Sequence, residues 1–86
     1  MRPALAAIGA DWGAEELRYA LHKKGLSWKA VSRHAGLRGG NARKVCDLPW
    51  PRVELVVAEL LEMRPEEIWP ERWARRAKRQ RMREAA

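Results

Sequence analysis

One stretch of the chain combines basic and amide side chains in a pattern suited to binding a polyanion. Between Ser27 and Val45 there are five basic residues and no carboxylate. The basic residues are Lys29, Arg33, Arg38, Arg43 and Lys44, and Asn41 lies among them. Guanidinium and ammonium groups bind phosphate oxygens, and arginine and asparagine also hydrogen-bond to base edges in the major groove. This stretch therefore has the chemistry of a nucleic-acid surface.

The apolar and small residues of the same stretch predict the two helices that would position these groups. A first short helix can begin at Ser27, whose side chain can accept a backbone hydrogen bond, and Gly36 stands where the chain must turn sharply. A second helix is expected around residues 40–46, crossing the first. The residues expected to face one another inside are Val31, Ala35, Leu37, Ala42 and Val45. This is the spacing of a helix-turn-helix, although a plain helical hairpin with solubilising charges fits the same pattern.

The charge distribution supports an acidic partner. The net charge is +7 and the pI is about 10.5. From Arg72 to the end of the chain, seven basic residues face only Glu84, whereas the rest of the chain is nearly neutral. Most of the acids follow the helix-turn-helix segment, between Asp47 and Glu71. We therefore expect one basic face and one acidic face.

Length and composition exclude several classes of protein. A chain of 86 residues is expected to make one small domain. Cys46 is the only cysteine, which excludes an intrachain disulfide and favours a reducing, cytoplasmic location. Together with His22 and His34 it supplies too few ligands for zinc, and we expect no metal or other cofactor. We also find no catalytic constellation, and no apolar run reaches the roughly 18 residues of a membrane span.

The remaining segments predict the helices of a small core. Asp11 is expected to cap a first helix with a buried stripe of Leu17, Ala20 and Leu21, and Gly25 ends that helix. Pro51 is placed to begin a central packing helix. The stripe of that helix is Val53, Val56, Val57, Leu60 and Leu61.

Tryptophans should supply most of the aromatic burial. The Arg64-Pro65 pair should end the central helix, and a short turn after it delivers Ile68 and Trp69 to the core. We expect Trp12, Trp50 and Trp69 to pack rather than to stack on bases. Trp28 has two uses open to it, since its ring can cover the helix junction while its indole N–H meets a phosphate.

Four segments together resemble the Ner-like (Nlp) family of phage and bacterial transcription regulators. They are DW at 11–12, LSWKAVSRHAGL at 26–37, WPRVE at 50–54 and RPEEIWPERW at 64–73. The resemblance implies an all-α, lambda-repressor-like bundle of about five helices. It also implies sequence-specific binding of double-stranded DNA operators and repression of early phage promoters, without catalytic activity.

The chain departs from the usual family pattern at Gly39 and Gly40, which we expect in the first turn of the recognition helix. Because these residues cannot read bases through side chains, readout should shift to their neighbours. For base or groove contacts we expect Arg38, Asn41, Arg43 and Lys44. For backbone contacts we expect Ser27, Trp28, Lys29 and Arg33.

The two ends of the chain are expected to flank the DNA-binding domain at 11–73. Residues 1–10 should form a flexible arm, and residues 74–86 a basic, helical tail. The tail residues expected to touch the DNA backbone are Arg75, Arg76, Lys78 and Arg79. A frayed solubilising helix is the other possibility for the tail. The competing function is an RNA-binding or protein-interaction module that uses this arginine-rich tail. We expect a monomer or weak homodimer that pairs on DNA.

Overall fold

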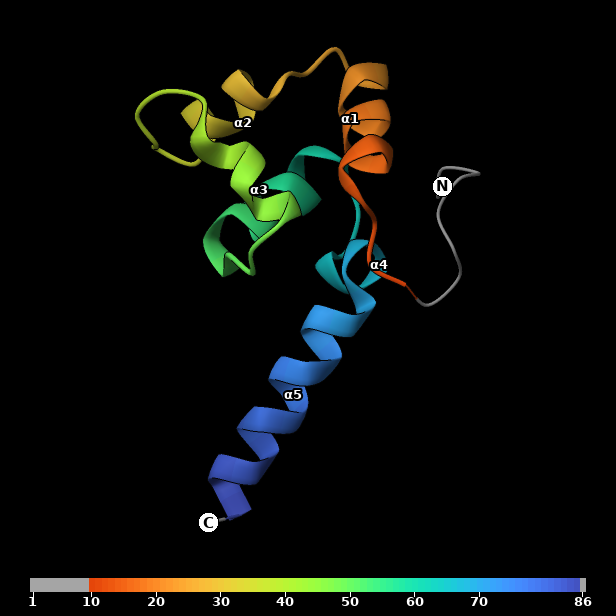
Figure 1. Ribbon diagram of the computed structural model, residues 1–86, viewed down its shortest axis with the longest axis vertical. Coiled ribbons are helices and arrows are strands. Elements are labelled where there is room, and N and C mark those ends of the chain that lie inside the picture. Colours follow the sequence, from red (N-terminus) through yellow and green to blue (C-terminus); the bar gives the residue numbers. More distant parts are fainter. Residues whose placement is uncertain (1–9, 86) are drawn as a thin grey trace.

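The structure is a computed structural model that describes residues 10–85, so the expected N-terminal arm lies outside the described residues except for Ala10. Within that range the chain forms six helices and no strand (Figure 1). In chain order they are α1 (Ala14–Lys23), α2 (Trp28–His34), the 3-10 helix η1 (Asn41–Cys46), α3 (Pro51–Leu60), α4 (Pro65–Ile68) and α5 (Pro70–Ala85). The predicted all-α helical bundle is confirmed.

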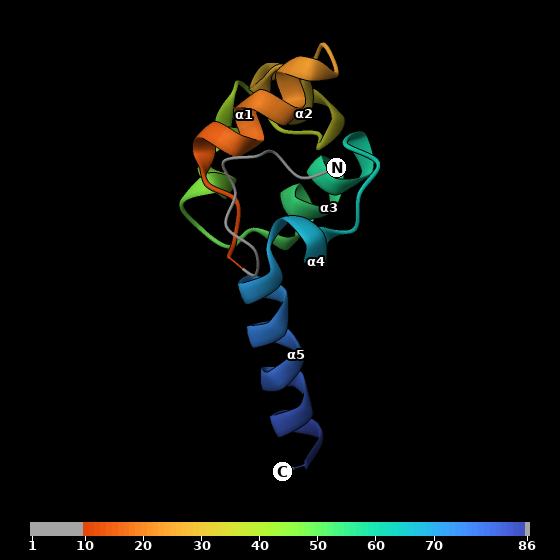
Figure 2. The same ribbon diagram turned by 90° about the vertical axis from the view of Figure 1, so that its right-hand side faces the viewer.

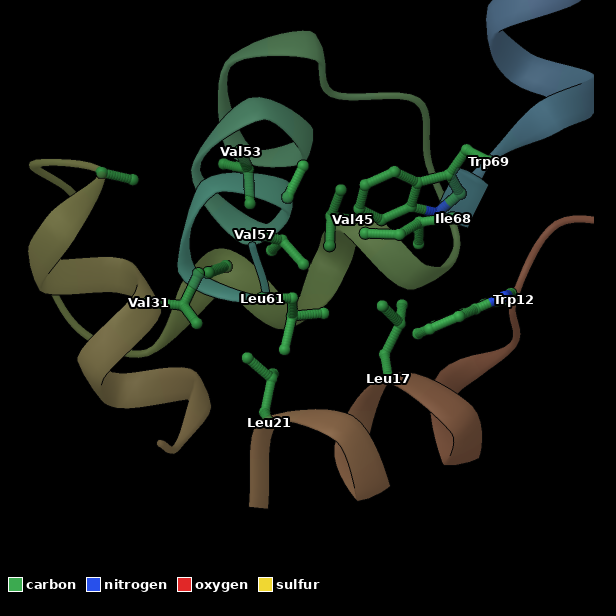
Figure 3. Close-up of a cluster of buried hydrophobic side chains, with 13 residues drawn as sticks. Trp12, Leu17, Leu21, Val31, Val45, Val53, Val57, Leu61, Ile68 and Trp69 are labelled. Carbon is green, nitrogen blue, oxygen red and sulfur yellow. The ribbon is translucent and has the colours of Figure 1, made fainter. Parts of the chain in front are cut away.

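The helices α1 to α4 and η1 surround one apolar core (Figure 3). The predicted stripes supply it: Leu17 and Leu21 of α1 are buried, as are Val53 and Val57 of α3. The other core residues are Trp12, Val31, Ala35, Ala42, Val45, Ala58, Leu61, Ile68 and Trp69. Burying side chains of this size stabilises the fold by roughly 1.5–3 kcal/mol each. Trp12 and Trp69 pack inside as predicted, and Trp50 is half-buried against the core.

Asp11 does not have the role expected of it. The N-cap of α1 is Gly13, with no side-chain cap. Asp11 Oδ1 instead accepts a hydrogen bond of 2.7 Å from the backbone N–H of Glu71, and its Oδ2 lies 3.6 Å from Nε of Arg72. The carboxylate therefore satisfies a free N–H in the first turn of α5, 60 residues away in sequence. It connects the beginning of the domain to its last helix.

The helix boundaries follow the predicted turn chemistry. Gly25 ends α1 with φ of +71°, a conformation that costs glycine little. Pro51 is the first residue of α3, and Arg64 stands as the N-cap of α4 before Pro65. The turn after α3 also contains Glu62 at φ +57°, whose carboxylate accepts a 2.6 Å hydrogen bond from Nζ of Lys24. This exposed ion pair links the ends of α1 and α3.

The last helix leaves the globule. Figures 1 and 2 show α5 starting beside α4 and projecting away from the other helices, with its far end free. It runs without a break across the predicted boundary between residues 73 and 74, and none of its residues is fully buried. The basic segment is thus a direct extension of a helix that begins against the core.

Candidate nucleic-acid interface

The predicted helix-turn-helix is present as α2, a glycine-containing turn and η1. Ser27 Oγ caps α2 by accepting a 3.2 Å hydrogen bond from the backbone N–H of Ala30. Gly36 takes φ of +73° at the turn, as predicted. The expected inner residues are buried, except that Leu37 is half-buried: they are Val31, Ala35, Ala42 and Val45.

The two helices are joined through Ser32, a residue that we did not predict to matter. Its side chain is fully buried, and Oγ accepts a 3.0 Å hydrogen bond from the backbone N–H of Ala42 while donating to the carbonyl of Trp28 at 2.9 Å. Its carbonyl accepts from the N–H of Leu37 at 2.8 Å. Both ends of the connecting loop are therefore attached to Ser32. The sequence held one signal for this role of Ser32, which is a hydroxyl group next to Val31 on the inner side of α2.

The second helix differs from expectation in type and in starting point. It is a 3-10 helix that begins at Asn41, and the prediction that Gly39 and Gly40 occupy its first turn is wrong. Gly39 has φ of +69°, which a right-handed helix cannot contain, and Gly40 is the N-cap. The two glycines therefore belong to the turn.

The 3-10 geometry sorts the side chains of η1 into three rows. With three residues per turn, positions three apart lie above one another. Ala42 and Val45 form the buried row, and Asn41 and Lys44 share a second row in which both are exposed. Arg43 begins the third row and is exposed too. Three of the four predicted base-reading side chains thus stand together on the outer side of η1.

The fourth predicted reader lies on the loop before η1. Arg38 is exposed, and its carbonyl accepts a 3.2 Å hydrogen bond from Nδ2 of Asn41. This bond is itself exposed, so a base edge can replace the carbonyl as the partner of the Asn41 amide. Arg38 and Asn41 are therefore neighbours on the surface that we predicted.

The predicted backbone-contact residues belong to α2. Ser27, Lys29 and Arg33 are exposed, whereas Trp28 is half-buried and packs against the core. Of the two uses open to Trp28, the structure thus shows that its ring covers the helix junction.

A hollow of about 300 Å³ joins this set to residues that sequence reasoning missed. Arg18 and His22 of α1 line it with Ser27, Trp28 and Arg43, and the apolar side chains of Leu21 and Leu26 form the rest of the lining. The lining contains no carboxylate. The charged side chains of this lining are therefore basic, supplied by Arg18 of α1 and Arg43 of η1. The signal in the sequence was the spacing of Arg18 and His22, one helical turn apart on the flank of the α1 stripe.

The C-terminal end of η1 is held by a residue from the last helix. Arg72 Nη1 donates to the carbonyl of Val45 at 2.6 Å, and its Nη2 donates to the carbonyl of Cys46 at 3.1 Å. The end of a helix carries free carbonyls and partial negative charge, both of which a guanidinium neutralises. Arg72 thereby fixes the recognition helix to α5.

Glu54 completes this attachment from inside the molecule. Its side chain is fully buried and accepts hydrogen bonds from Arg76 Nη1 and Nη2 at 2.6 and 2.9 Å, and from the Trp50 N–H at 2.7 Å. Trp73 Nε1 donates at 3.1 Å and Arg72 Nη1 at 3.3 Å. Burial alone would raise the pKa of Glu54, but the hydrogen bonds from Arg76 and the Trp50 backbone, with the charges of Arg76 and Arg72, lower that pKa below its ordinary value.

The hydrogen bonds around Glu54 change two expectations drawn from the sequence. Glu54 belongs to the interior rather than to an acidic face. Arg76, which we expected to touch the DNA backbone, has both terminal nitrogens bonded to Glu54. Arg75, Lys78 and Arg79 are exposed on α5.

Three further features of residues 10–85 describe the surroundings of this surface. Burial raises the pKa of the Cys46 thiol above its ordinary value, and the charge of Asp47 raises it further. No three histidine, cysteine, aspartate or glutamate residues in this part of the chain come together as they would around a metal ion. None of its helices is long and apolar enough to cross a membrane.

Comparison with known proteins agrees with the helix-turn-helix geometry. A family model described as winged helix-turn-helix DNA-binding matches residues 11–85. Sugar fermentation stimulation protein B of Escherichia coli K12 is 36% identical over 63 residues, which cover 73% of this chain and 68% of that protein. The negative regulator of transcription of Escherichia phage Mu is 35% identical over 63 residues, covering 73% and 84% of the two chains.

A third relative is the Mu-like prophage FluMu DNA-binding protein Ner of Haemophilus influenzae, 30% identical over 69 residues that cover 80% of this chain and 78% of that protein. The wing in the name of the family model usually denotes a β-hairpin, but residues 10–85 contain no strand and continue from η1 into further helices. The fold, the exposed basic helix and these matches agree, and the chain belongs to the Ner-like family of helix-turn-helix DNA-binding proteins.

Proposed function

We propose that this protein binds a specific sequence in double-stranded DNA and represses transcription from the promoter that contains it. The observation that carries the proposal is the outer side of η1, where Asn41, Arg43 and Lys44 are exposed together. The major groove is wide enough to admit one helix and presents a distinct pattern of donors and acceptors for each base pair. Arginine suits guanine there, and asparagine suits adenine.

The contacts divide between reading bases and fixing register. Arg38, Asn41, Arg43 and Lys44 are the proposed readers, since they stand on η1 and the loop before it. For the phosphate backbone we propose Ser27, Trp28, Lys29 and Arg33 of α2, joined by Arg18 and His22 of α1 through the shared hollow. A phosphate seated in that hollow would be bound from both helices. This would set the angle at which η1 enters the groove.

The direction of regulation rests on the relatives. The phage Mu and phage D108 proteins are both named negative regulators of transcription, whereas the name of the Escherichia coli relative refers to stimulation of sugar fermentation. The basic surface described here fits simple occupancy of promoter DNA, which blocks access and requires no catalysis. We therefore propose a Ner-type repressor of phage or prophage early promoters.

We further propose that the protein works in the cytoplasm, on the nucleoid or on phage DNA, as a monomer or a weak dimer that pairs on its operator. The large apolar side chains exposed in residues 10–85 are Tyr19, Leu48, Leu55 and Met82. They are few, which favours a weak association over an obligate dimer. Pairing on DNA would place two half-sites about one helical turn apart.

Selection of bound duplexes from a random DNA pool tests the proposal. We expect enrichment of one motif, with half-site spacing and stoichiometry readable from the same sequences. The selected duplex should then bind at least about 10³-fold more tightly than a scrambled duplex at physiological salt. A pool without enrichment, or an RNA competitor that displaces the protein as well as the selected duplex does, would overturn the proposal in favour of an RNA-binding module.

A further inference from the structure

The basic residues of α5 are not spread evenly around the helix. At about 100° per residue, positions three, four, seven and eleven apart fall on one face. The arginines at these offsets form a stripe, which we call the arginine stripe: Arg72, Arg75, Arg76, Arg79 and Arg83. Lys78 and Arg81 have other angular positions and lie toward the opposite side of the helix.

The inner end of the arginine stripe is fixed in direction by the contacts already described. Arg72 binds the carbonyls at the end of η1, and Arg76 binds Glu54. Because a helix is stiff over four turns, the outer members of the stripe continue along the side of α5 that meets the recognition helix. The free end of α5 leans toward the side of the molecule that carries α2 and η1 in Figure 1.

The outer members of the stripe have no acidic partner within residues 10–85. Arg75, Arg79 and Arg83 are exposed, and the ion pairs formed by α5 in this part of the chain involve Arg72 and Arg76. Arg75, Arg79 and Arg83 follow one another with a rise of about 6 Å along the helix axis, and the whole stripe from Arg72 to Arg83 is about 16 Å long. Phosphates occur every 3.4 Å of helix axis along each DNA strand, so arginines about 6 Å apart on a stiff helix can each meet roughly every second phosphate.

The same helix is poorly suited to a membrane. Its remaining positions are mostly alanine and polar residues, Trp73 is bonded to Glu54, and Met82 is its one exposed large apolar side chain. A membrane-binding helix needs a broad apolar face, which is missing here. A nucleic-acid backbone therefore fits the surface of α5 better than a lipid interface does.

We propose that Arg75, Arg79 and Arg83 bind the phosphate backbone of duplex DNA flanking the bases that η1 reads. The inference rests on the proposed DNA-binding function and extends its footprint in one direction along the duplex. It also revises the tail residues expected from the sequence. Arg75 and Arg79 remain proposed contacts with the DNA backbone, and Arg83 is added to them. Arg76 is bonded to the buried Glu54 instead, and Lys78 does not belong to the arginine stripe.

Two charge-matched double variants test the proposal in the full-length chain. Arg79→Ala/Arg83→Ala removes two charges from the stripe, and Lys78→Ala/Arg81→Ala removes two charges from the other side of the same helix. Affinity for the selected duplex is measured as a function of salt, with helix content checked by circular dichroism. The stripe variant should bind about tenfold more weakly, with a salt slope smaller by roughly 2, because two phosphate contacts are lost. The control should lose less than about twofold.

Shortening the duplex beside the core motif locates the contact. For the wild-type protein, removal of one flank should reproduce the loss seen in the stripe variant, and the stripe variant should be insensitive to that removal. Equal losses in the two double variants, or no loss in either, would overturn the proposal. So would an RNA or acidic peptide that competes with the wild type but not with the stripe variant. In each of these cases sequence-specific binding by the wild type would persist, so the proposed function itself would stand.

Discussion

The two ends of the recognition helix η1 are held very differently. Its beginning follows a loop with two glycines, and Ser32 attaches it by one side-chain hydrogen bond to the N–H of Ala42. Its end is bound by Arg72, which is in turn part of a buried cluster around Glu54. The C-terminal end of η1 is therefore held by more contacts than its first turn. If η1 enters the major groove as proposed, its first turn would approach the bases first.

The open space around Gly39 and Gly40 fits the difference between the two ends of η1. A Cβ at Gly39 or Gly40 would meet no protein atom within 4 Å. Neither residue is therefore a glycine because of crowding inside the protein. Gly39 needs its positive φ, whereas Gly40 has φ of −100° and ψ of 34° and does not. Gly40 is therefore a position where an added methyl group tests whether DNA comes close to this loop.

The largest effect on stability should come from removing the contacts that hold the C-terminal end of η1. Glu54→Ala leaves Arg72 and Arg76 without their buried partner, and removing one member of a buried ion pair costs about 3–5 kcal/mol. We expect the free energy of unfolding, measured in urea, to fall by that amount. Glu59→Ala on the exposed side of α3 is the matched control and should change stability by less than about 0.5 kcal/mol. Equal effects of the two substitutions would show that Glu54 does not hold this end.

Low pH should weaken the same attachment, which holds the C-terminal end of η1. The pKa of Glu54 is lowered in the folded protein, so the folded state binds fewer protons than the unfolded state as the pH falls. The stabilisation is complete above the unfolded pKa of about 4.3 and is lost as the pH drops through the lower folded value. We expect wild-type stability to fall more steeply below about pH 4.3 than that of Glu54→Gln. Parallel curves in thermal unfolding would argue against the charge of Glu54 as the stabilising group.

A smaller loss is expected when the attachment at the beginning of η1 is removed. Ser32→Ala leaves the buried N–H of Ala42 without its acceptor, which should cost about 1–3 kcal/mol. Amide hydrogen exchange should show faster exchange at Ala42, with the amides of α3 changed only through the global loss of stability. Unchanged protection at Ala42 would mean that another group holds the first turn.

The smallest effect on stability should come from Gly40→Ala. Gly40 has a negative φ and a Cβ there meets nothing, so reduced entropy of the unfolded chain should stabilise the fold by up to about 0.4–1 kcal/mol. If Arg38 and Asn41 contact DNA as proposed, affinity for the selected duplex should nevertheless fall, because the new methyl group would lie between them. A variant that is both more stable and equally tight would remove Gly40 from the interface. Gly39→Ala is the contrasting variant and should destabilise, since φ of +69° is strained with a Cβ.

Features set by local rules could be read from the sequence. Ser27, Gly36 and Pro51 act through the backbone within a few residues, and each has the predicted role. The apolar stripes of α1 and α3 were also predictable, because helical periodicity alone determines which side chains turn inward. This information sufficed for the fold class and for the exposed side of η1.

Features that join distant segments could not be read in this way. Asp11 caps α5 rather than α1, and Arg72 and Arg76 reach partners 18 to 27 residues away. Nothing in the spacing of these charges distinguishes them from the exposed charges beside them. The buried carboxylate of Glu54 was missed for the same reason, since its partners are defined only once α5 docks on α3. Ser32 of α2 and Arg72 of α5 likewise bond to the two ends of η1 from distant parts of the chain.

The most direct test of this account is the specificity ratio of Arg43→Ala/Lys44→Ala, meaning its affinity for the selected duplex divided by its affinity for a scrambled one. Both side chains are exposed, so the variant should keep the stability of the wild type. If η1 reads the major groove, the ratio should fall by at least about 30-fold, because each of the two base contacts contributes about 1–3 kcal/mol of discrimination. A ratio equal to that of the wild type, in a variant that is fully folded, would contradict the account.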